Sequence, residues 1–336
     1  MHVTYVLLFC LLVSCSTKPV EQPVVSKAPA GPVAEPAGDG TILRLEGLPV
    51  AAGAKIEKIA GGFGFIEGPI WFKETGNIWF SDVAGNVIRQ WSPADGAITE
   101  ILRPGGYDGS DAPEGAHVGP NGMIIDKAGN VLIAQHGNRR IARRSPAGVI
   151  TTLVDRFEGK RLNSPNDMVF HSSGALYFTD PPYGLLKQDE DPKKELAFNG
   201  IYRLLGGKLT LLNKEMSRPN GIALSPDERW LYVANSDAAR KVWMKFSVAD
   251  DGTIGPGRVF ADVTAVVEDG LPDGMKVDAK GNVWATGPGG VWVFSAEGKH
   301  LGTIKPNEAP ANCAFADDGA TLWMTARTSL YRIKLR

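Results

Sequence analysis

The chain has 336 residues and carries 36 lysines and arginines against 37 aspartates and glutamates, a formal net charge of −1. This balance provides no basic field to attract phosphates, so we expect no nucleic-acid partner. Forty glycines and eight tryptophans, with almost no helical periodicity, favour many short β-strands joined by tight turns.

The N-terminus begins with an apolar stretch over residues 6–15, which is too short for the ~20 residues that span a bilayer. Its last four residues, LVSC, resemble the bacterial lipobox, in which cleavage leaves a lipidated cysteine. We therefore expect residues 1–14 to be a lipoprotein signal peptide and Cys15 to carry the lipid. An ordinary secretory signal is the alternative. Ser16 resembles the sorting residue of outer-membrane lipoproteins, which predicts a cell-envelope protein facing the periplasm or outward, with the lipid anchor as its only membrane contact.

Residues 15–40 are rich in proline, alanine, valine and glutamate without periodicity, which predicts a disordered tether. Residues 41–336 then repeat one short phrase six times. Each copy has a polar residue, usually followed by glycine, then a hydrophobic strand, a glycine-containing turn and a second strand. The first residues of the copies lie 54, 45, 54, 53 and 39 positions apart: Glu67, Asn121, Asn166, Asn220, Asp273 and Asn312. This spacing predicts an all-β fold, a six-bladed β-propeller, as one domain.

These six first residues should face one axial pocket, because equivalent positions of a propeller lie at equivalent heights around its axis. All six side chains carry oxygen and two are carboxylates, which suits a hard divalent cation. We expect Ca²⁺, with Mg²⁺, Mn²⁺ or Zn²⁺ as alternatives; zinc is disfavoured because the five histidines show no metal-ligand spacing. The competing explanation, that these are ordinary turn residues, fits Asn121 and Asn312 best.

A second ring is predicted where the second strand of each repeat returns to the mouth of the pocket: Asp82, His136, Asp180, Asn235, Gly287 and Arg327. Together with Asn121, we expect Asp180, Asn235 and Arg327 to contact substrate. His136 is the one member that could move a proton near neutral pH, although a solvated or structural histidine is the alternative.

Two insertions and one cysteine complete the candidates. Residues 103–119, which include His117, form a lid or a surface loop, and the charged residues 185–198 are expected to be a solvated face. Cys313 is expected to be a small buried residue without a nucleophilic role. The usual motifs of serine esterases, nucleotide-binding loops and zinc proteases are absent from the sequence.

Several longer phrases resemble the senescence-marker-protein (SMP-30)/gluconolactonase/luciferin-regenerating-enzyme family, and the resemblance runs from about residue 61 to 336. The phrases are Leu162-Asn163-Ser164-Pro165-Asn166-Asp167, Tyr177-Phe178-Thr179-Asp180-Pro181-Pro182-Tyr183-Gly184, Arg218-Pro219-Asn220-Gly221 and Pro272-Asp273-Gly274-Met275-Lys276-Val277-Asp278. The resemblance implies a six-bladed propeller with one catalytic divalent metal, commonly calcium. The implied ligands are Glu67, Asn166, Asn220 and Asp273.

The same resemblance implies hydrolysis of a lactone, an aldonolactone such as glucono-1,5-lactone. We also expect a monomer. The resemblance makes Asp273 the first choice of general base. A metal-bound carboxylate should have a lowered pKa, however, so His136 is the physical rival. Two other functions stay open: a non-catalytic propeller that binds a sugar or envelope partner, and a hydrolase of aryl esters or phosphotriesters that uses the same metal.

Overall fold

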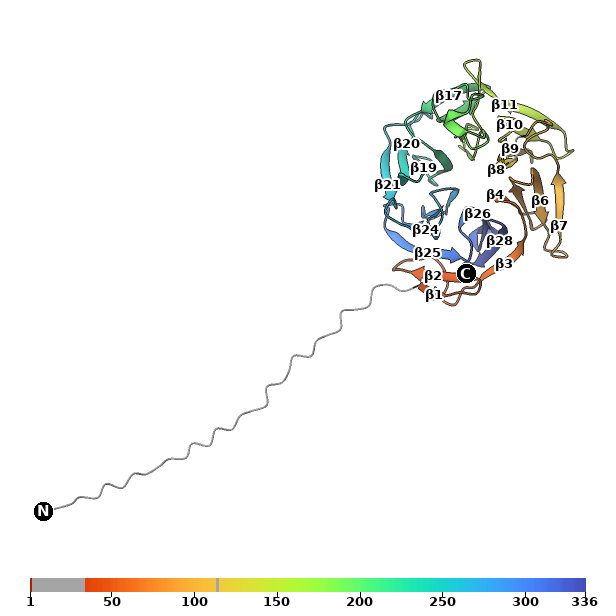
Figure 1. The fold of residues 1–336 in the computed structure, drawn as a ribbon. Coiled ribbons are helices and arrows are strands. Elements are labelled where there is room, and N and C mark those ends of the chain that lie inside the picture. The colour runs from red at the N-terminus through yellow and green to blue at the C-terminus, as the bar shows by residue number, and fades with distance from the viewer. Residues whose placement is uncertain (2–33, 113–114) are drawn as a thin grey trace. The chain divides into compact units, whose positions relative to one another are not determined.

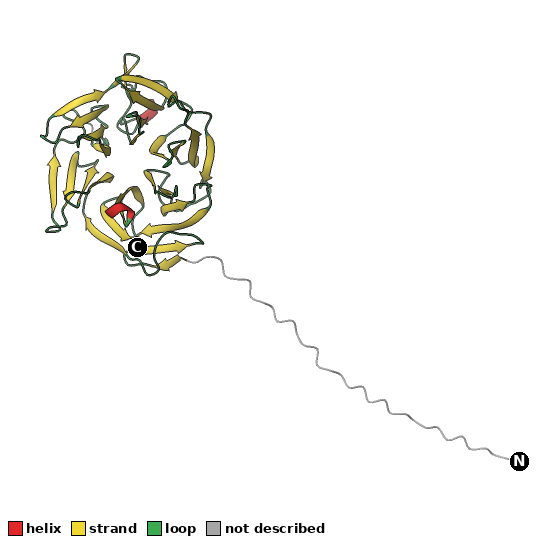
Figure 2. Cartoon of the chain, turned by 180° about the vertical axis from the view of Figure 1, so that it is seen from behind, coloured by secondary structure: helices red, strands yellow, loops and turns green. Residues whose placement is uncertain are grey.

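The computed structural model describes residue 1 and residues 34–112 and 115–336, and the predicted signal peptide, Cys15 and most of the tether lie outside these residues. Residues 34–336 contain almost only strands, arranged as six sheets around a central axis (Figure 1). Two short 3₁₀ helices, η1 (Gln188–Glu190) and η2 (Asp317–Gly319), are the helical elements of this part (Figure 2). The predicted all-β six-bladed propeller is therefore confirmed. Within the described residues, no helix is long and apolar enough to cross a membrane.

Each blade is an antiparallel sheet whose first strand lies nearest the axis. The first blade contains β4 (Ile66–Phe72), β5 (Asn77–Asp82), β6 (Val87–Trp91) and β7 (Ile98–Leu102), and the second contains β8 (Pro120–Ile125), β9 (Val131–Gln135), β10 (Arg140–Arg144) and β11 (Ile150–Val154). The third blade contains β14 (Met168–Phe170), β15 (Leu176–Asp180), β16 (Gly200–Leu205) and β17 (Lys208–Asn213), and the fourth contains β18 (Pro219–Leu224), β19 (Trp230–Asp237), β20 (Arg240–Ser247) and β21 (Arg258–Asp262). The fifth blade contains β22 (Met275–Val277), β23 (Val283–Gly287), β24 (Gly290–Phe294) and β25 (His300–Pro306), and the sixth contains β26 (Pro310–Ala316), β27 (Thr321–Ala326), β28 (Ser329–Lys334) and β3 (Ile56–Gly61). A small hairpin, β12 (Arg156–Phe157) and β13 (Lys160–Arg161), follows the second blade.

The ring is closed by the early part of the chain. Strand β3 pairs with β28 and so completes the last blade with a strand from the beginning of the propeller. Strands β2 (Gly40–Arg44) and β1 (Ala34–Pro36) extend the fifth blade beyond β25. Within the described residues, strand pairing therefore reaches back to residue 34, into the segment that was predicted to be a tether. Strand β1 has the sequence Ala-Glu-Pro, which carries no strand signal, and it is held by backbone pairing to β2.

The core lies between neighbouring blades and combines aliphatic side chains with large aromatic ones. Trp243, Trp284 and Trp323 are among the largest side chains that are fully buried. Cys313 is 0% exposed, and burial raises the pKa of its thiol to about 12. The prediction of a small buried cysteine is therefore confirmed.

The glycine of the repeated phrase has a packing role. A Cβ at Gly68 would lie 2.1 Å from the carbonyl oxygen of Asn121, and one at Gly221 would lie 2.2 Å from that of Asp273. Each of these carbonyl groups belongs to the next blade. The glycines thus let the inner segments of adjacent blades approach closely, which brings the first residues of the phrases together around the axis.

Candidate active site

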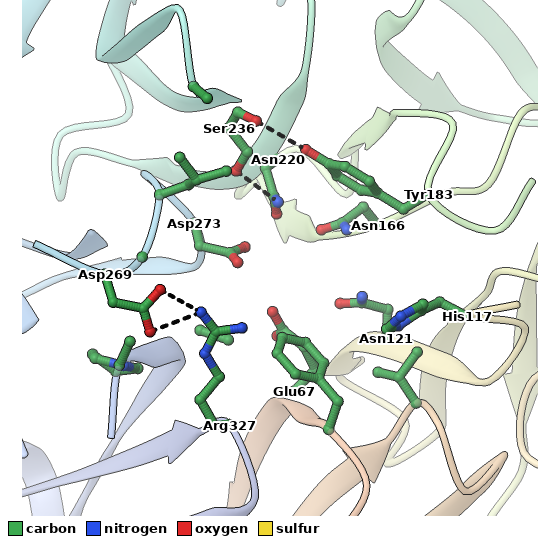
Figure 3. A pocket seen from close by; sticks show the side chains of 18 of the residues that line it. Glu67, His117, Asn121, Asn166, Tyr183, Asn220, Ser236, Asp269, Asp273 and Arg327 are labelled. Carbon is green, nitrogen blue, oxygen red and sulfur yellow. Dashed lines mark hydrogen bonds and ion pairs between the residues drawn. The ribbon is translucent and has the colours of Figure 1, made fainter. Parts of the chain in front are cut away.

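A cavity of about 590 Å³ lies at the axis, and five of the six first residues of the repeats line it: Glu67, Asn121, Asn166, Asn220 and Asp273. Their side chains extend from different blades toward one shared space (Figure 3). We call these five residues the axial ring. The repeat pattern therefore predicted which side chains meet, although they are up to 206 positions apart in the chain (273 − 67).

The sixth first residue, Asn312, stands behind the axial ring and does not line the cavity. Its Nδ2 donates a hydrogen bond to Oε2 of Glu67 at 3.0 Å, and its Oδ1 accepts one from the backbone N–H of Cys313 at 2.8 Å. The N–H of Gly68 also donates to Oε2 of Glu67, at 2.8 Å. Asn312 therefore orients the Glu67 carboxylate.

Three buried oxygens of the axial ring have no hydrogen-bond partner among the described residues: Oδ1 of Asn121, Asn220 and Asp273. Asn220 is held in this orientation because its Nδ2 donates to Oγ of Ser236 at 3.0 Å. An unpaired buried polar atom costs about 1–3 kcal/mol, so three in one cavity indicate a missing electropositive partner. A cation would provide it.

The charge of the site supports the same conclusion. Glu67 is 2% exposed, and burial raises its pKa to about 7. Burial, followed by the charges of Glu67 and Asp167, raises the pKa of the half-buried Asp273 well above its ordinary value. Asp167 is itself buried, and its pKa is raised mainly by burial and lowered in part by Lys276. Three carboxyl groups thus share a space in which burial disfavours their ionised forms, and a divalent cation would favour those forms.

The donor set fits a hard cation that accepts amide oxygens. In residues 34–112 and 115–336, no group of three or more His, Cys, Asp or Glu side chains lies close enough together to bind a metal. A cation in the axial ring would therefore depend on asparagine oxygens as well as carboxylates, which calcium tolerates and zinc does not favour. Asp167 was not proposed as a site residue; it occupies the position where most copies of the phrase have glycine.

The predicted second ring divides into two groups. His136 and Arg327 line the cavity, whereas Asp82, Asp180, Asn235 and Gly287 do not. Asp180 and Asn235 were expected to contact substrate, but the structure places them outside the cavity wall, with hydrogen bonds to backbone groups.

We call Asp82, Asp180 and Asn235 the anchors, because their side chains hold the loops that lead into the axial ring. Asp180 is 0% exposed and accepts the N–H groups of Asn163 and Ser164, both at 2.8 Å, just before Asn166. Oδ1 of Asn235 accepts the N–H of Arg218 at 2.9 Å, two residues before Asn220.

Asp82 has the same function in the first blade. It accepts the N–H of Gly64 at 3.2 Å, three residues before Glu67. The three anchors thus repeat one local design, in which the end of the second strand fixes the approach to the inner strand.

His136 is buried in the cavity wall, and only one of its two ring nitrogens has a hydrogen-bond partner among the described residues. Its Nδ1 lies 3.2 Å from the carbonyl oxygen of His117, so Nδ1 carries the proton, and Nε2 is left as an acceptor without a partner in the described part of the chain. Burial lowers the pKa of His136 to about 4. The ring is therefore neutral at pH 7 and can only accept a proton there.

Tyr183 and Asp269 also line the cavity, and Asp269 pairs with Arg327. Tyr183, which sequence reasoning did not assign a role, donates its hydroxyl to the carbonyl oxygen of Ser236 at 3.4 Å (Figure 3). Burial, and then the charge of Asp273, raise the pKa of Tyr183, so the phenol stays protonated. Arg327 pairs with both carboxylate oxygens of Asp269, at 2.6 and 2.8 Å.

Each insertion also contributes to the cavity. His117 belongs to residues 103–119 and Gln188 to residues 185–198, and both line the cavity. The second insertion is thus more than the expected solvated face, although Gln188, Asp189 and Glu190 are exposed to solvent. Tyr183 could have been noticed in the sequence, because it lies in the Pro-Pro-Tyr-Gly phrase after Asp180.

Comparison with known proteins places the fold and the site in one family. Residues 65–328 match the SMP-30/Gluconolactonase/LRE-like region. The chain is 39% identical over 291 residues to a gluconolactonase of Zymomonas mobilis, which covers 84% of this chain and 81% of that protein. The structure of a gluconolactonase, XC5397, from Xanthomonas campestris superposes with a TM-score of 0.77 at 32% identity, covering 92% of this chain and 99% of that one.

A more distant structure shares the fold alone. It is a calcium-binding protein, regucalcin, from Agrobacterium tumefaciens, with a TM-score of 0.64 at 22% identity, covering 83% of this chain and 93% of that one. The family match spans the whole axial ring, and the resemblance predicted from the repeated phrases is confirmed. The chain belongs to the SMP-30/gluconolactonase/LRE-like family.

Proposed function

We propose that this protein is a metal-dependent hydrolase that opens a lactone ring. The observation that carries the proposal is the set of buried oxygens without a partner among the described residues, beside the two carboxyl groups of the axial ring, whose pKa values are raised by burial. Glu67, Asn166, Asn220 and Asp273 would hold one divalent cation, for which calcium is the best fit. Once bound, such a cation supplies a Lewis acid that polarises the carbonyl group of a substrate.

The residues of the cavity would act on the lactone and on a water molecule. Water attacks the carbonyl carbon, the acyl C–O bond of the ring breaks, and the ring oxygen becomes a hydroxyl group. Asp273 is the first candidate to take the proton from this water, and the free Nε2 of His136 is its rival. The hydroxyl of Tyr183 is placed to donate a hydrogen bond to substrate, because its present bond to Ser236 is long at 3.4 Å.

The two candidate bases can be separated by their pH profiles. Replacing His136→Gln should leave kcat within about threefold if Asp273 is the base, and should lower it by roughly 100-fold or more if His136 is the base. The profile of kcat/KM against pH would also lose its acidic limb only if the residue replaced is the base. Metal affinity should stay unchanged in this variant, because His136 is outside the proposed ligand set.

We propose an aldonolactone such as glucono-1,5-lactone as the substrate class. The similarity to two proteins named gluconolactonase, at 39% and 32% identity, supports this choice. The cavity of about 590 Å³ is large enough for a small sugar lactone, and Arg327 and Tyr183 offer donors for hydroxyl groups. Asn121, which lines the cavity but was not assigned to the metal, is proposed to contact substrate from the same wall.

The proposal is tested by proton release from glucono-1,5-lactone, measured against the spontaneous background. Activity should disappear after chelation and return when calcium is restored. Activity that survives complete chelation would disprove the metal mechanism. Absence of activity with calcium, magnesium, manganese and zinc would disprove the lactonase and would favour another ester or a binding function.

We also propose that the protein works from the cell envelope, anchored through a lipid on Cys15. The support is the lipobox-like sequence before Cys15 and the proline-rich segment that follows it. Mass spectrometry of the mature protein should find acyl chains on an N-terminal Cys15. Cleavage at another position without lipid would support an ordinary secretory signal instead.

A further inference from the structure

A second cavity, of about 310 Å³, lies on the other side of the two insertions from the active site. Neighbouring residues of the same segments line the two cavities. His136 faces the first and Gly137 the second, and Tyr183 faces the first and Gly184 the second. The second cavity is therefore separated from the active site by little more than the thickness of these segments.

Among the described residues, this cavity is lined by four cationic side chains, Arg139, Arg161, Lys187 and Lys193, and two acidic ones, Asp111 and Asp191. Asp191 is already used by the backbone, since it accepts the N–H groups of Lys187 and Lys193 at 3.0 and 2.9 Å. Asp111 accepts the hydroxyl of Tyr107 and lies 3.7 Å from Nζ of Lys193. Glu195 also lies 3.9 Å from Arg139, so the four cations exceed the neighbouring carboxylates by one.

Arg139 is the buried member of this group. It is 4% exposed, and its Nε donates to the carbonyl oxygen of Leu162 at 2.7 Å. Its Nη1 donates to the carbonyl oxygen of Lys193 at 2.7 Å, and its nearest carboxylate is that of Glu195, at 3.9 Å. Nη2 has no hydrogen-bond partner among the described residues. A buried guanidinium with a free donor calls for an explanation, because the unpaired group costs stability.

We propose that this second cavity binds a small organic anion through a phosphate or carboxylate group. A guanidinium presents a planar pair of donors that matches these oxyanions, and Arg139 and Arg161 both line the cavity. The volume is near the lower limit of ligand sites in proteins, which suits a metabolite and excludes a polymer.

A bound anion would also join the two insertions. Tyr107 and Asp111 come from residues 103–119, and Lys187 and Lys193 come from residues 185–198. Both insertions also line the active-site cavity, through His117 and Gln188. The anion would therefore stiffen part of the active-site wall without touching the axial ring. This inference goes beyond the proposed lactonase and does not depend on it.

The test is isothermal titration calorimetry of the full chain, from which metal has been removed by a chelator that is then dialysed away, with inorganic phosphate and gluconate as the two probes. At least one probe should bind with a dissociation constant below about 1 mM, which corresponds to about −4 kcal/mol. Tight binding of phosphate alone would identify a phosphate-bearing ligand, and tight binding of gluconate alone a carboxylate-bearing one. Because the metal is removed, the result is independent of lactone hydrolysis.

A pair of matched variants tests whether the probe binds in the second cavity. Arg161→Gln should weaken the better probe roughly tenfold, because it removes a half-buried guanidinium from the cavity. Lys160→Gln removes the same charge from the preceding residue, which does not line the cavity, and should leave the dissociation constant unchanged. Arg139 is not used as the first variant, since its guanidinium also holds backbone carbonyl groups and its loss can unfold the region.

Two results would overturn the proposal. One is the absence of binding by either probe up to about 10 mM, which would leave Arg139 as a structural clamp. The other is equal weakening by Arg161→Gln and Lys160→Gln, which would show attraction to general surface charge. Thermal unfolding of each variant in chelator would verify that the fold is intact.

Discussion

The axial ring and the anchors are two sets of polar side chains in the same propeller, both oxygen-rich and both placed by the same repeat. Asp180, an anchor, accepts two backbone N–H groups at 2.8 Å, whereas Oδ1 of Asp273, in the axial ring, has no partner among the described residues. Polarity and position in the repeat are therefore not enough to identify a site. Hydrogen-bond satisfaction separates the residues that build the site from those that serve it.

The largest effect is expected for Glu67→Gln, which removes one of the two carboxylates from the proposed ligand set. Calcium affinity should fall by at least about 100-fold, and lactonase activity at micromolar calcium should be lost. In chelator, the variant should be at least as stable as the parent protein, because a buried carboxylate has been neutralised. Calcium titration calorimetry and urea unfolding measure the two effects.

The control for this variant is Glu100→Gln, the same change at an exposed glutamate of β7 that pairs with Arg103. It should leave calcium affinity unchanged. Parental calcium affinity in Glu67→Gln would mean that the axial ring is not the metal site.

An anchor should behave in the opposite way. Asp180→Ala removes the acceptor of two buried N–H groups, so the free energy of unfolding should fall by about 2–4 kcal/mol even in chelator. Asp180→Asn keeps one acceptor oxygen and should recover part of this loss. Urea denaturation in chelator measures both variants against Asp273→Asn, which should not destabilise the metal-free protein. If Asp180→Ala and Asp273→Asn lower stability equally, the distinction between anchors and axial ring is wrong.

The sequence allowed the fold and the membership of the axial ring to be predicted, because the repeat places the first residue of each phrase at the axis. The sequence could not show that Arg327 lines the cavity whereas Asp180 and Asn235 do not, since all three lie at or near the end of the second strand of a blade. What distinguishes them is the neighbouring loop: Asp180 meets the N–H groups before Asn166, and no periodic pattern encodes that contact.

Two other features were missed for physical reasons. Strand β1 is held by backbone pairing to β2, which composition does not reveal. The second cavity is formed by residues from two insertions and two hairpins, and loop residues far apart in sequence show no common period. Tyr183 belongs to one of the phrases that carry the family resemblance, but the phrase alone does not show that its hydroxyl reaches the carbonyl oxygen of Ser236.

Asn312 combines features of the axial ring and of the anchors, because it lies in the repeat position of the axial ring but is hydrogen-bonded like an anchor. Asn312→Ala removes the 3.0 Å bond to Glu67, so calcium affinity should fall roughly tenfold. Because the residue positions a ligand and does not contact substrate, kcat should return toward the parental value at saturating calcium. Calorimetry together with activity at increasing calcium distinguishes the two effects. A kcat that stays low at saturating calcium would instead place Asn312 in the reaction itself.

The smallest effect concerns Glu308, a carboxylate that is satisfied by its neighbours and so contrasts with Glu67. It accepts the N–H of Thr328 at 2.9 Å, the hydroxyl of Tyr331 at 3.0 Å and Nζ of Lys58 at 3.1 Å, and the last bond fastens the closing strand β3. Burial raises the pKa of Glu308, but hydrogen bonds from Ser329, Thr328 and Lys58 outweigh it and hold the pKa at about 2.

A folded-state pKa below the ordinary value of 4.5 means that Glu308 stabilises the fold above about pH 4.5, and that this contribution is lost as the pH falls toward 2. Glu308→Gln should therefore cost about 1 kcal/mol at pH 7, less than the pKa difference alone suggests, because the partly exposed carboxylate is screened by solvent. Urea unfolding of both proteins between pH 7 and pH 3 measures the difference, which should shrink as the solution becomes more acidic. A difference that is constant with pH would show that the glutamate acts through packing and not through its charge. A shrinking difference would show that a carboxylate surrounded by donors strengthens the propeller only while it is ionised, whereas Glu67, which needs a cation, weakens the metal-free protein in its ionised form.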